Sequence, residues 1–385
     1  MTNDIFNKKF EEIYLQPAQA ISCTPGRVNL IGEFTDYNNG FVLPCALEFA
    51  TRILFRKRDD NQIVVHSLHY PGEHDEFSLD GDIIHGDSQW GNYIRAVAFV
   101  FRRQGHQLCG VDLLIDSNIP QGSGLSSSAA LEVAVGGVFN QLCQLNLSNQ
   151  MIALLGQQAE NDFIDCQCGI MDQLVSANGE KGHALLIDCQ SLVTESICIP
   201  DGISIVIVNS NYPRKLVDSE YNQRRIDCER AADKMSVSSL RNANIDKLNT
   251  ARSKMTNNEY KRAHHVITEN IRVLNAVEAL KHNDMQTLRE LMSASHQSLK
   301  NDFEVTVLET DGLVDICQTA LGNEGAVRMT GGGFGGAIVC LCPHRYIDEI
   351  KNAVDAHYYD RFNIHASIYV SKAGDGLRVS LLTTP

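Results

Sequence analysis

The stretch Pro120-Gln121-Gly122-Ser123-Gly124-Leu125-Ser126-Ser127-Ser128-Ala129-Ala130 decides the fold, since it joins a strand-like run to a long apolar helix. Residues 110–115 (GVDLLI) have the alternation and β-branched content of a strand, and residues 129–142 are apolar nearly all round, like a buried helix. Small residues let the backbone approach an anion closely, and the first amides of a helix are unpaired donors at the positive end of its dipole. The stretch is therefore predicted to be a phosphate loop.

The two commonest nucleotide loops do not fit this stretch. A Walker loop ends in Gly-Lys-Ser/Thr, a tripeptide that occurs nowhere in the chain. A dinucleotide fingerprint needs glycine where this loop has Ser127. The loop thus predicts a nucleotide triphosphate held by backbone amides and serine hydroxyls. The segment alone leaves a second interpretation open, a Gly/Ser-rich connector in which a serine caps the helix.

Composition indicates a globular protein. The 385 residues, of which 43% are hydrophobic, suffice for a buried core and suggest two domains. The net charge of −14 argues against a general affinity for nucleic acid or an anionic membrane. The first residues form no apolar leader and no run reaches about 18 apolar residues, so we expect a cytoplasmic protein without a membrane span. The 12 cysteines are expected to be reduced thiols.

Mixed strands and helices predict an α+β protein more than a doubly wound α/β sheet. Domains are expected at 1–200 and 201–385, with the active site in the cleft between them. The pair His264-His265 lies in a polar helical run and is predicted to be solvated surface. Ser148 is expected to cap a helix that runs to Asp165. The other expected elements are strands within 20–79 and at 183–188, 203–209 and near 326–371, helices at 89–103, 218–235, 258–281, 284–299, 304–320 and 345–358, and a surface connection at 236–256.

Two further motifs carry chemistry. Residues 25–37 (PGRVNLIGEFTDY) place one cation and two carboxylates between glycines at the end of a strand. Carboxylates accept hydrogen bonds from sugar hydroxyls and arginine offers a fork for phosphate, although a solvated charged turn would have the same composition. Residues 331–336 (GGGFGG) contain G-x-G-x-x-G, but a strand-like run follows them. A tight loop against a ligand or a domain partner is therefore expected there.

The three motifs, in this order and at about this spacing, resemble those of the GHMP kinases, a family that includes galactokinase, homoserine kinase and mevalonate kinase. The pattern PGRVNLIGE-x-TDYN-x-G-FVLP, which starts at Pro25, is similar to the signature of the galactokinase group. The segments CGIMDQ (168–173), SEYNQRR (219–225) and RMTGGGFGG (328–336) are similar to that group as well. The resemblance covers nearly the whole chain.

The resemblance implies a two-domain GHMP kinase-like fold and transfer of the γ-phosphoryl group of MgATP to the C1 hydroxyl of α-D-galactose. By matching motif positions, Asp172 would be the catalytic carboxylate and Arg27 would stabilise the transferring group. ATP and Mg2+ would be the cofactors, galactose and ATP the only partners, and the protein a monomer. The sugar site would be lined by Glu33, Phe34, Thr35, Asp36 and Tyr221. The ATP phosphates would contact Gly122, Ser123, Gly124, Leu125, Ser126, Ser127 and Ser128, and Mg2+ would bind Ser128 and Glu160.

One position departs from the pattern of the family. Galactokinases usually carry histidine between the glutamate and threonine of the first motif, and this chain has Phe34. A phenyl ring cannot hydrogen-bond a sugar hydroxyl. Two alternatives therefore stay open, a kinase for a related hexose such as N-acetylgalactosamine and a non-catalytic sensor of galactose and ATP. The uninterrupted Ser128-Ala129 step of the phosphate loop favours the enzyme.

Overall fold

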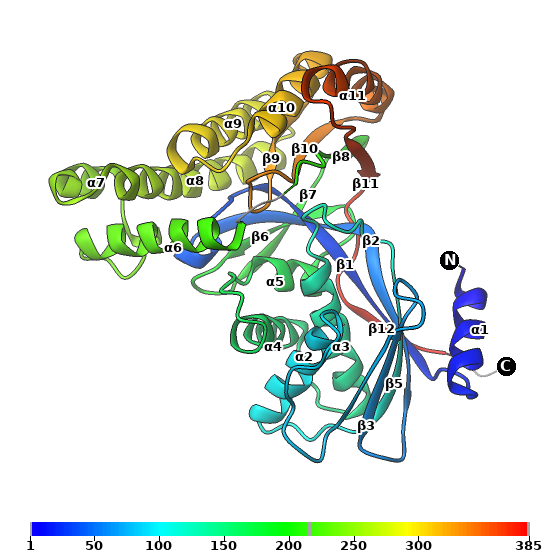
Figure 1. Cartoon of the computed structure of the whole chain (residues 1–385). Coiled ribbons are helices and arrows are strands. Elements are labelled where there is room, and N and C mark those ends of the chain that lie inside the picture. The colour runs from blue at the N-terminus through cyan, green and yellow to red at the C-terminus, as the bar shows by residue number, and fades with distance from the viewer. Residues whose placement is uncertain (1, 214–216, 383–385) are drawn as a thin grey trace.

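The computed structural model describes residues 2–213 and 217–382, which build two sheets with helices packed around them (Figure 1). The first sheet has the strand order β12-β1-β2-β5-β3-β4, and β6 pairs with β2 and β7. Its strands are β1 (Ala20–Ile31), β2 (Phe41–Lys57), β3 (Gln62–Ser67), β4 (His74–Ser78), β5 (Val111–Ser117), β6 (His183–Asp188), β7 (Thr194–Cys198) and β12 (Arg378–Leu381). The pairing of β3 with β5 is parallel, and the other named pairings of this sheet are antiparallel.

The second sheet is antiparallel and has the order β11-β8-β10-β9. Its strands are β8 (Ile203–Asn209), β9 (Ala326–Thr330), β10 (Ala337–Pro343) and β11 (Ser367–Ser371). The hairpin between β9 and β10 consists of the glycine-rich residues 331–336. The third motif is therefore a tight loop between strands, as its sequence context predicted.

Helices cover the sheets on different sides (Figure 1). Four of them, α2 to α5, lie on one face of the first sheet, and α1 lies on the opposite face, where Phe6 and Phe10 pack against Leu54 and Leu114. The helices of the first half are α1 (Asn3–Tyr14), α2 (Gly91–Arg103), α3 (Ser127–Leu142), α4 (Asn149–Asp162) and α5 (Met171–Asn178). Those of the second half are α6 (Val217–Lys234), α7 (Ile245–Ala251), α8 (Asn257–Lys281), α9 (Met285–Ser298), α10 (Leu308–Leu321) and α11 (Ile347–Phe362).

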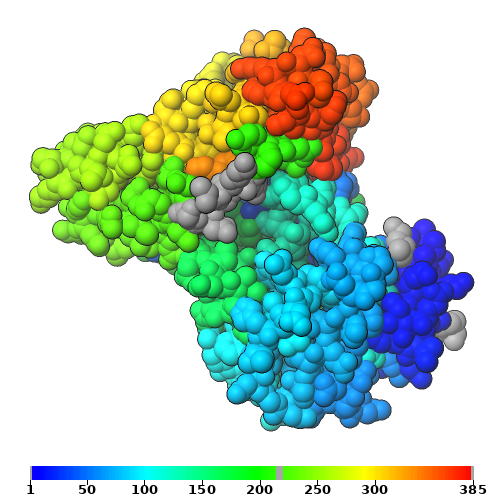
Figure 2. Space-filling view, in the orientation of Figure 1, coloured from blue at the N-terminus to red at the C-terminus, as the bar shows by residue number. Residues whose placement is uncertain are grey.

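A shared core joins the two halves. Leu30 of β1 and Leu43 of β2 belong to the same buried cluster as Val273 of α8 and Leu341 of β10. Burial of this apolar surface is the main interaction that holds the two halves together. The space-filling view shows a hollow between the cyan surface of the first half and the yellow and green surface of the second (Figure 2). The structure therefore confirms the predicted α+β architecture.

Several local predictions need correction. No strand was expected at residues 378–381, where β12 pairs with β1 in the first sheet. The connection at 236–256 contains the helix α7. The helix expected from residue 304 begins at Leu308, because a π-helical turn ends at Phe303 and Glu304 has a left-handed backbone (φ 56°). The helix capped by Ser148 ends at Asp162 and does not reach Asp165.

The prediction for His265 is wrong, because this side chain is 0% exposed. The cap by Ser148 is confirmed, since its hydroxyl accepts a hydrogen bond from the amide of Met151 at 3.2 Å. All 12 cysteines are free thiols. Among the helices that the structure describes, none combines the length and the apolar character needed to cross a membrane.

Candidate active site

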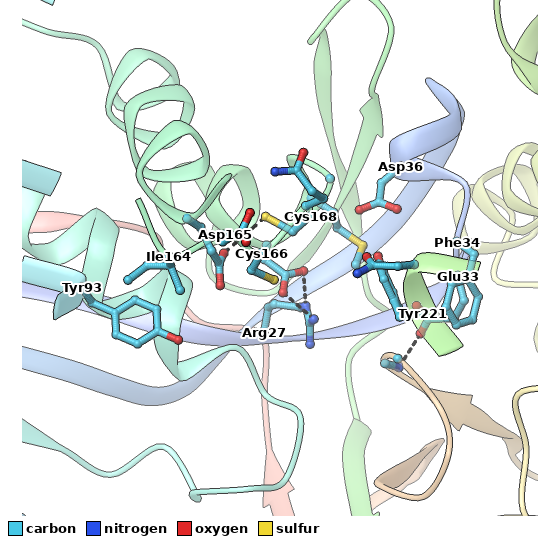
Figure 3. A pocket seen from close by; sticks show the side chains of 18 residues that line it. Arg27, Glu33, Phe34, Asp36, Tyr93, Ile164, Asp165, Cys166, Cys168 and Tyr221 are labelled. Atoms are coloured by element: carbon cyan, nitrogen blue, oxygen red, sulfur yellow. Dashed lines mark hydrogen bonds and ion pairs between the residues drawn. The ribbon is translucent and has the colours of Figure 1, made fainter. Parts of the chain in front are cut away.

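A cavity of about 480 Å³ is lined by residues from both halves of the chain. Figure 3 shows Tyr93 and Ile164 at one end of it, Phe34 and Tyr221 at the other, and Arg27 between them. The predicted site residues that line this cavity are Arg27, Glu33, Phe34, Asp36, Glu160, Asp172 and Tyr221. The fold thus gathers around one space most of the residues that the motifs had singled out.

Arg27 and Asp172 form a bidentate ion pair in the wall of the cavity. Nε of Arg27 donates to Oδ1 of Asp172 at 2.7 Å, and Nη2 donates to Oδ2 at 2.6 Å. Arg27 lies on β1 and Asp172 in the first turn of α5, so two elements distant in sequence hold the pair. The Arg27 side chain is 8% exposed and the Asp172 side chain 28%, so the carboxylate is the more accessible partner. Such forked pairs fix both groups in one geometry.

The phosphate loop is a strained turn in front of α3. Gly122 and Gly124 have positive φ angles of 69° and 76°, and Ser126 has the left-handed values φ 58° and ψ 52°. Ser123 and Leu125 are 1% and 2% exposed as whole residues, so the surface that the loop offers to an anion comes from its other residues. The first bond within α3 runs from the amide of Ala130 to the carbonyl of Ser126, which leaves the amides of the first turn as free donors at the helix start.

The loop also contacts the ion pair directly. Nη1 of Arg27 donates to the carbonyl of Gly124 at 2.7 Å, and the Arg27 amide donates to the carbonyl of Leu125 at 3.0 Å. Oγ of Ser126 donates to Oδ2 of Asp172 at 2.5 Å. These contacts join the phosphate loop, β1 and α5 into one unit, which fixes the distance between an anion on the loop and the Asp172 carboxylate.

Ser128 and Glu160, the predicted metal ligands, lie within hydrogen-bonding reach of each other. Glu160 is 8% exposed, and burial, followed by the charge of Asp172, raises the pKa of its carboxyl. Nε2 of Gln173 bridges the carboxylates of Glu160 (2.7 Å) and Glu132 (3.0 Å), while Oε1 of Glu132 and Oε1 of Gln173 are buried without a partner. Several acidic groups with few cations in a buried space are a setting that a divalent cation would stabilise.

The residues present fit Mg2+ in particular. Hydroxyl and carboxylate oxygens are the hard ligands that Mg2+ prefers, and this ion usually takes only one or two carboxylates and completes its shell with phosphate oxygens and water. Within the described residues, no group of three or more His, Cys, Asp or Glu side chains is arranged to hold a metal ion by itself. A site built from Ser128 and Glu160 would therefore depend on the phosphates of the nucleotide.

Glu33 connects the first motif with the third. Its Oε1 accepts hydrogen bonds from the amide of Gly331 (2.8 Å), from Oγ1 of Thr330 (3.1 Å) and from Nη1 of Arg328 (3.3 Å). Arg328 is 0% exposed and also donates to the carbonyls of Asn29 and Leu30 at 3.1 Å. The glycine-rich loop thus holds the Glu33 carboxylate at the cavity wall by direct hydrogen bonds.

Phe34 packs mostly against other aromatic rings. It is 4% exposed, and its ring lies 4.5 Å from that of Phe303 in a stacked arrangement and 5.8 Å from that of Tyr221. Tyr221 also contacts Tyr37 edge-on at 5.6 Å, which holds α6 against the first motif. The ring that replaces the usual histidine is therefore part of an apolar cluster at one end of the cavity (Figure 3).

Asp36 and Thr35 differ in their orientation. Asp36 lines the cavity, and a Cβ at position 169 would overlap its carboxylate, so only glycine fits at Gly169. The expectation that Thr35 lines the sugar site needs correction, because Thr35 is 0% exposed and is absent from the cavity wall. Its hydroxyl lies 2.6 Å from the carbonyl of Phe41 and 2.9 Å from that of Gly32. Thr35 therefore closes the loop internally.

A second cavity of about 340 Å³ lies next to the phosphate loop, and sequence reasoning missed it. Ser127 and Ser128 line one side and Trp90 another, and Tyr93 lines both cavities. The rings of Trp90 and Tyr70 stack at 5.9 Å with an interplanar angle of 4°. Aromatic walls beside a phosphate loop suit the flat base of a nucleotide. The aromatic residues before and within the 89–103 helix were the available signal, but no motif connected them with the loop.

Comparison with known proteins agrees with this geometry. Residues 8–57 match the galactokinase galactose-binding signature, residues 92–180 the GHMP kinases N terminal domain, and residues 276–360 the GHMP kinases C terminal model. The structure is similar to that of Lactococcus lactis galactokinase complexed with galactose, with 35% sequence identity, a TM-score of 0.93, and coverage of 97% of this chain and 99% of that chain.

More distant structures share the fold alone. Methanococcus jannaschii mevalonate kinase has 17% identity and a TM-score of 0.64 over 93% of this chain and 99% of its own. Homoserine kinase from Cytophaga hutchinsonii has 15% identity and a TM-score of 0.62 over 95% of this chain and 98% of its own. The three matched models and the 35% identity over 97% of the chain show that the chain belongs to the GHMP kinase family. Within that family, the galactose-binding signature and the 35% identity place it among the galactokinases.

Proposed function

We propose that this chain transfers the γ-phosphoryl group of ATP to the C1 hydroxyl of α-D-galactose and releases galactose 1-phosphate and ADP. The observation that carries the proposal is the position of the Arg27–Asp172 pair, which lines the sugar cavity and is bonded to the phosphate loop. Phosphoryl transfer passes through a loose transition state, so positioning and charge neutralisation supply most of the catalysis. The pair offers a cation to the transferring group and a carboxylate to the attacking hydroxyl.

Asp172 acts on the attacking hydroxyl as its proton acceptor. Its carboxylate orients the C1 hydroxyl, and the proton of that hydroxyl passes to Asp172 as the bond from oxygen to the γ-phosphorus forms and the bond between the γ-phosphorus and the bridging oxygen of ADP breaks. Arg27 stays in place during this step, because the Gly124 carbonyl and both Asp172 oxygens hold its guanidinium. A fixed cation stabilises developing negative charge without reorganisation.

The nucleotide spans the second cavity and the phosphate loop. The base lies between Trp90 and the start of α3, and the phosphates contact the loop from Gly122 to Ser128. Ser128 and Glu160 would hold Mg2+, which would supply positive charge to neutralise the phosphates of the nucleotide. Tyr93, which lines both cavities, lies on the path from the base to the reacting hydroxyl.

The sugar occupies the end of the first cavity near Phe34 and Tyr221. Glu33 and Asp36 supply carboxylate oxygens to its hydroxyls, and the aromatic rings contact its apolar face. The cytoplasmic location and the monomeric state expected from the sequence stay predictions, and sedimentation velocity at assay concentration measures the second.

A coupled ADP-release assay tests the proposal. The wild-type chain is assayed with galactose, 2-deoxygalactose, N-acetylgalactosamine and glucose, with and without Mg2+, and the sugar phosphate is identified by mass spectrometry and phosphorus NMR. Galactose is expected to give the highest kcat/KM, with phosphate on C1. Faster turnover of N-acetylgalactosamine would assign the chain to a related hexose. Binding of galactose and ATP without ADP release would make the chain a sensor and overturn the proposal.

A further inference from the structure

Helix α8 presents three polar side chains to the backbone of residues 32–41, the segment of the first motif that we call the sugar loop. Oε1 of Glu269 accepts a hydrogen bond from the Gly32 amide at 3.0 Å. Nε2 of His265 lies 3.1 Å from the Glu33 carbonyl and must be the donor, because a carbonyl only accepts. Oδ1 of Asn270 accepts from the amide of Phe41, at the other end of the loop, at 2.8 Å.

These three helix side chains lie behind the cavity. His265 and Glu269 are 0% exposed and Asn270 is 7% exposed, and none of the three belongs to the cavity wall. His265 and Glu269 stand four positions apart and share one face of α8, and Asn270 follows Glu269 on the adjoining side of the helix. Their contacts are with the loop backbone, whereas the side chains of Glu33 and Asp36 on the same loop line the cavity.

The backbone at Gly32 has little freedom to compensate for a lost contact. Its φ of 103° is a conformation that L side chains rarely adopt, and a Cβ there would meet the carbonyl of Phe41 and Cγ2 of Val273, each at 2.9 Å. The loop therefore turns in a tight space between β2 and α8. Any shift of its first amide moves Glu33, the next residue, relative to the glycine-rich loop that bonds its carboxylate.

Glu269 is a buried charge with a complete set of partners. Besides the Gly32 amide, Oε1 accepts from Oγ of Ser295 at 2.6 Å, and Oε2 accepts from Nε of Arg272 at 2.6 Å. Burial opposes the charge, but Arg272 and then His265 hold the pKa of Glu269 down at about 2. An ionised buried carboxylate is costly unless it is paired and hydrogen-bonded, and the contacts with Gly32, Ser295 and Arg272 meet that condition.

We propose that Glu269 is a positioning residue for sugar phosphorylation, which together with His265 and Asn270 fixes the sugar-loop backbone so that Glu33 and Asp36 face the sugar. The inference rests on the proposed function of the cavity. Helix α8 supplies no residue to the cavity wall, and the inference gives it the task of aligning the groups that recognise the sugar. If these three residues had a purely structural role, their substitution would lower stability and leave the KM for sugar unchanged.

The test compares Glu269→Gln with Glu259→Gln. The isosteric amide at 269 must turn its NH2 group toward either Arg272 or the Gly32 amide, both donors, so the variant either loses the bond to the loop or keeps it with a neutral acceptor beside an unpaired Arg272. Glu259 is a matched control, because it is also a buried carboxylate on α8 (3% exposed) and its partners are Lys234 and the Thr256 amide, far from the loop. Steady-state kinetics give KM for sugar and for ATP, and thermal melts give the Tm with and without galactose.

Glu269→Gln is expected to raise KM for galactose about tenfold or more, to leave KM for ATP within twofold, and to reduce the rise in Tm that galactose causes. Glu259→Gln is expected to lower the Tm but to keep KM for galactose within twofold. Equal KM values for galactose in wild type and Glu269→Gln would overturn the inference, as would a rise of the same size in Glu259→Gln.

Two further measurements cover the cases in which Glu269→Gln does not fold or the wild type releases no ADP. Should Glu269→Gln fail to fold, Asn270→Ala removes the single contact with the Phe41 amide and is expected to raise KM for galactose by at least threefold, and an unchanged KM there overturns the inference. Should wild type release no ADP, the proposed function fails, and the galactose-induced rise in Tm then measures alignment of the sugar loop by itself. An equal rise in wild type and Glu269→Gln would overturn the inference in that case also.

Discussion

Oγ of Ser126 donates a hydrogen bond to the same Oδ2 of Asp172 that accepts from Nη2 of Arg27. A residue of the phosphate loop therefore bonds the same oxygen as Arg27, on a carboxylate that lies 46 positions further along the sequence. Ser126 also carries the left-handed backbone from which α3 starts. Movement of the loop on nucleotide binding would thus move the Asp172 carboxylate, to which the proposed function assigns the attacking hydroxyl.

Asp172→Asn should abolish turnover while the fold and ATP binding stay largely intact. The amide keeps the shape of the carboxylate but cannot accept the proton of the hydroxyl, and positioned acid–base groups contribute about 10²–10⁴-fold. Single-turnover and steady-state rates with galactose measure the loss, and a thermal melt with ATP checks nucleotide binding. More than a tenth of the wild-type kcat in this variant would remove Asp172 from its assigned role.

Ser126→Gly should lower kcat about tenfold or more, with KM for ATP changed less than threefold. Glycine accepts the φ of 58° without strain, so the substitution removes the hydrogen bond to a charged group, which contributes about 1.5–3 kcal/mol, and little else. Ser126→Ala is the companion variant, because it removes the same hydroxyl but strains the backbone. If Ser126→Gly keeps the wild-type kcat, the contact with Asp172 has no part in catalysis.

Ser128→Ala and Glu160→Ala should each raise the Mg2+ concentration for half-maximal rate by about tenfold. Each variant loses an oxygen that would bind the ion or hold its other ligand. Titration of Mg2+ at saturating ATP gives the midpoint. Ser148→Ala is the control, since this hydroxyl caps the start of α4, the helix that carries Glu160, and is bonded to the Met151 amide. Midpoints that stay at the wild-type value in both test variants would place the metal elsewhere.

Asp36→Asn should stabilise the unliganded protein at pH 8 by about 2 °C or more in Tm. Burial, and then the charge of Asp172, raise the pKa of Asp36 from 3.8 to about 7. Because the folded pKa is the higher one, the stabilisation by protonated Asp36 is complete below about pH 4 and is lost as the pH rises through 7.

The advantage of Asp36→Asn should therefore shrink as the pH falls toward 5. Melts of both proteins across this pH range give the comparison. Asp165→Asn, which neutralises an exposed carboxylate on the wall of the same cavity, is run in parallel. An advantage that is independent of pH would show that a different effect of the amide, and not the titration of Asp36, is responsible.

Phe34→His should lower KM for galactose and leave KM for ATP nearly unchanged. A histidine can bond a sugar hydroxyl, and one net hydrogen bond of about 0.5–1.5 kcal/mol corresponds to roughly twofold to tenfold. The variant should also melt at a lower temperature, because Phe34 is 4% exposed and stacks on Phe303. Kinetics with galactose and N-acetylgalactosamine decide the matter. An unchanged KM for galactose would mean that position 34 does not recognise the sugar.

Local sequence patterns predicted the secondary structure around the phosphate loop, because that structure depends on neighbouring residues. The strand, the loop and α3 followed from residue size and periodicity around Gly122 to Ser128, and the motifs placed Arg27 and Asp172 in one site. The roles of the matched residues came from the family resemblance, and not from periodicity. Glycine at 169 was quoted within a motif, but its reason, the close approach of Asp36, is visible only in three dimensions.

The remaining geometry of the site depends on contacts between segments that are distant in sequence, and local patterns do not show these contacts. The Glu33 carboxylate accepts from the amide of Gly331, 298 positions later in the chain. The Glu33 carbonyl accepts from His265, 232 positions later. A polar run such as 258–281 shows the period of a helix but not which polar face another segment will bury. For the same reason Thr35 was assigned to the sugar, although its hydroxyl closes the loop internally.

The pairing of β12 with β1 has a consequence for synthesis of the chain on the ribosome. Residues 20–23 of β1 find their outer partner only in residues 378–381, which are made 355 to 361 positions later (Cys23↔Arg378 and Ala20↔Leu381). Until then, this part of the first sheet presents an open edge of unpaired amides and carbonyls, a template for pairing with other chains. Messages that stop before Arg378 would therefore yield products that aggregate through β1, even though the phosphate loop and the Arg27–Asp172 pair are both present in them.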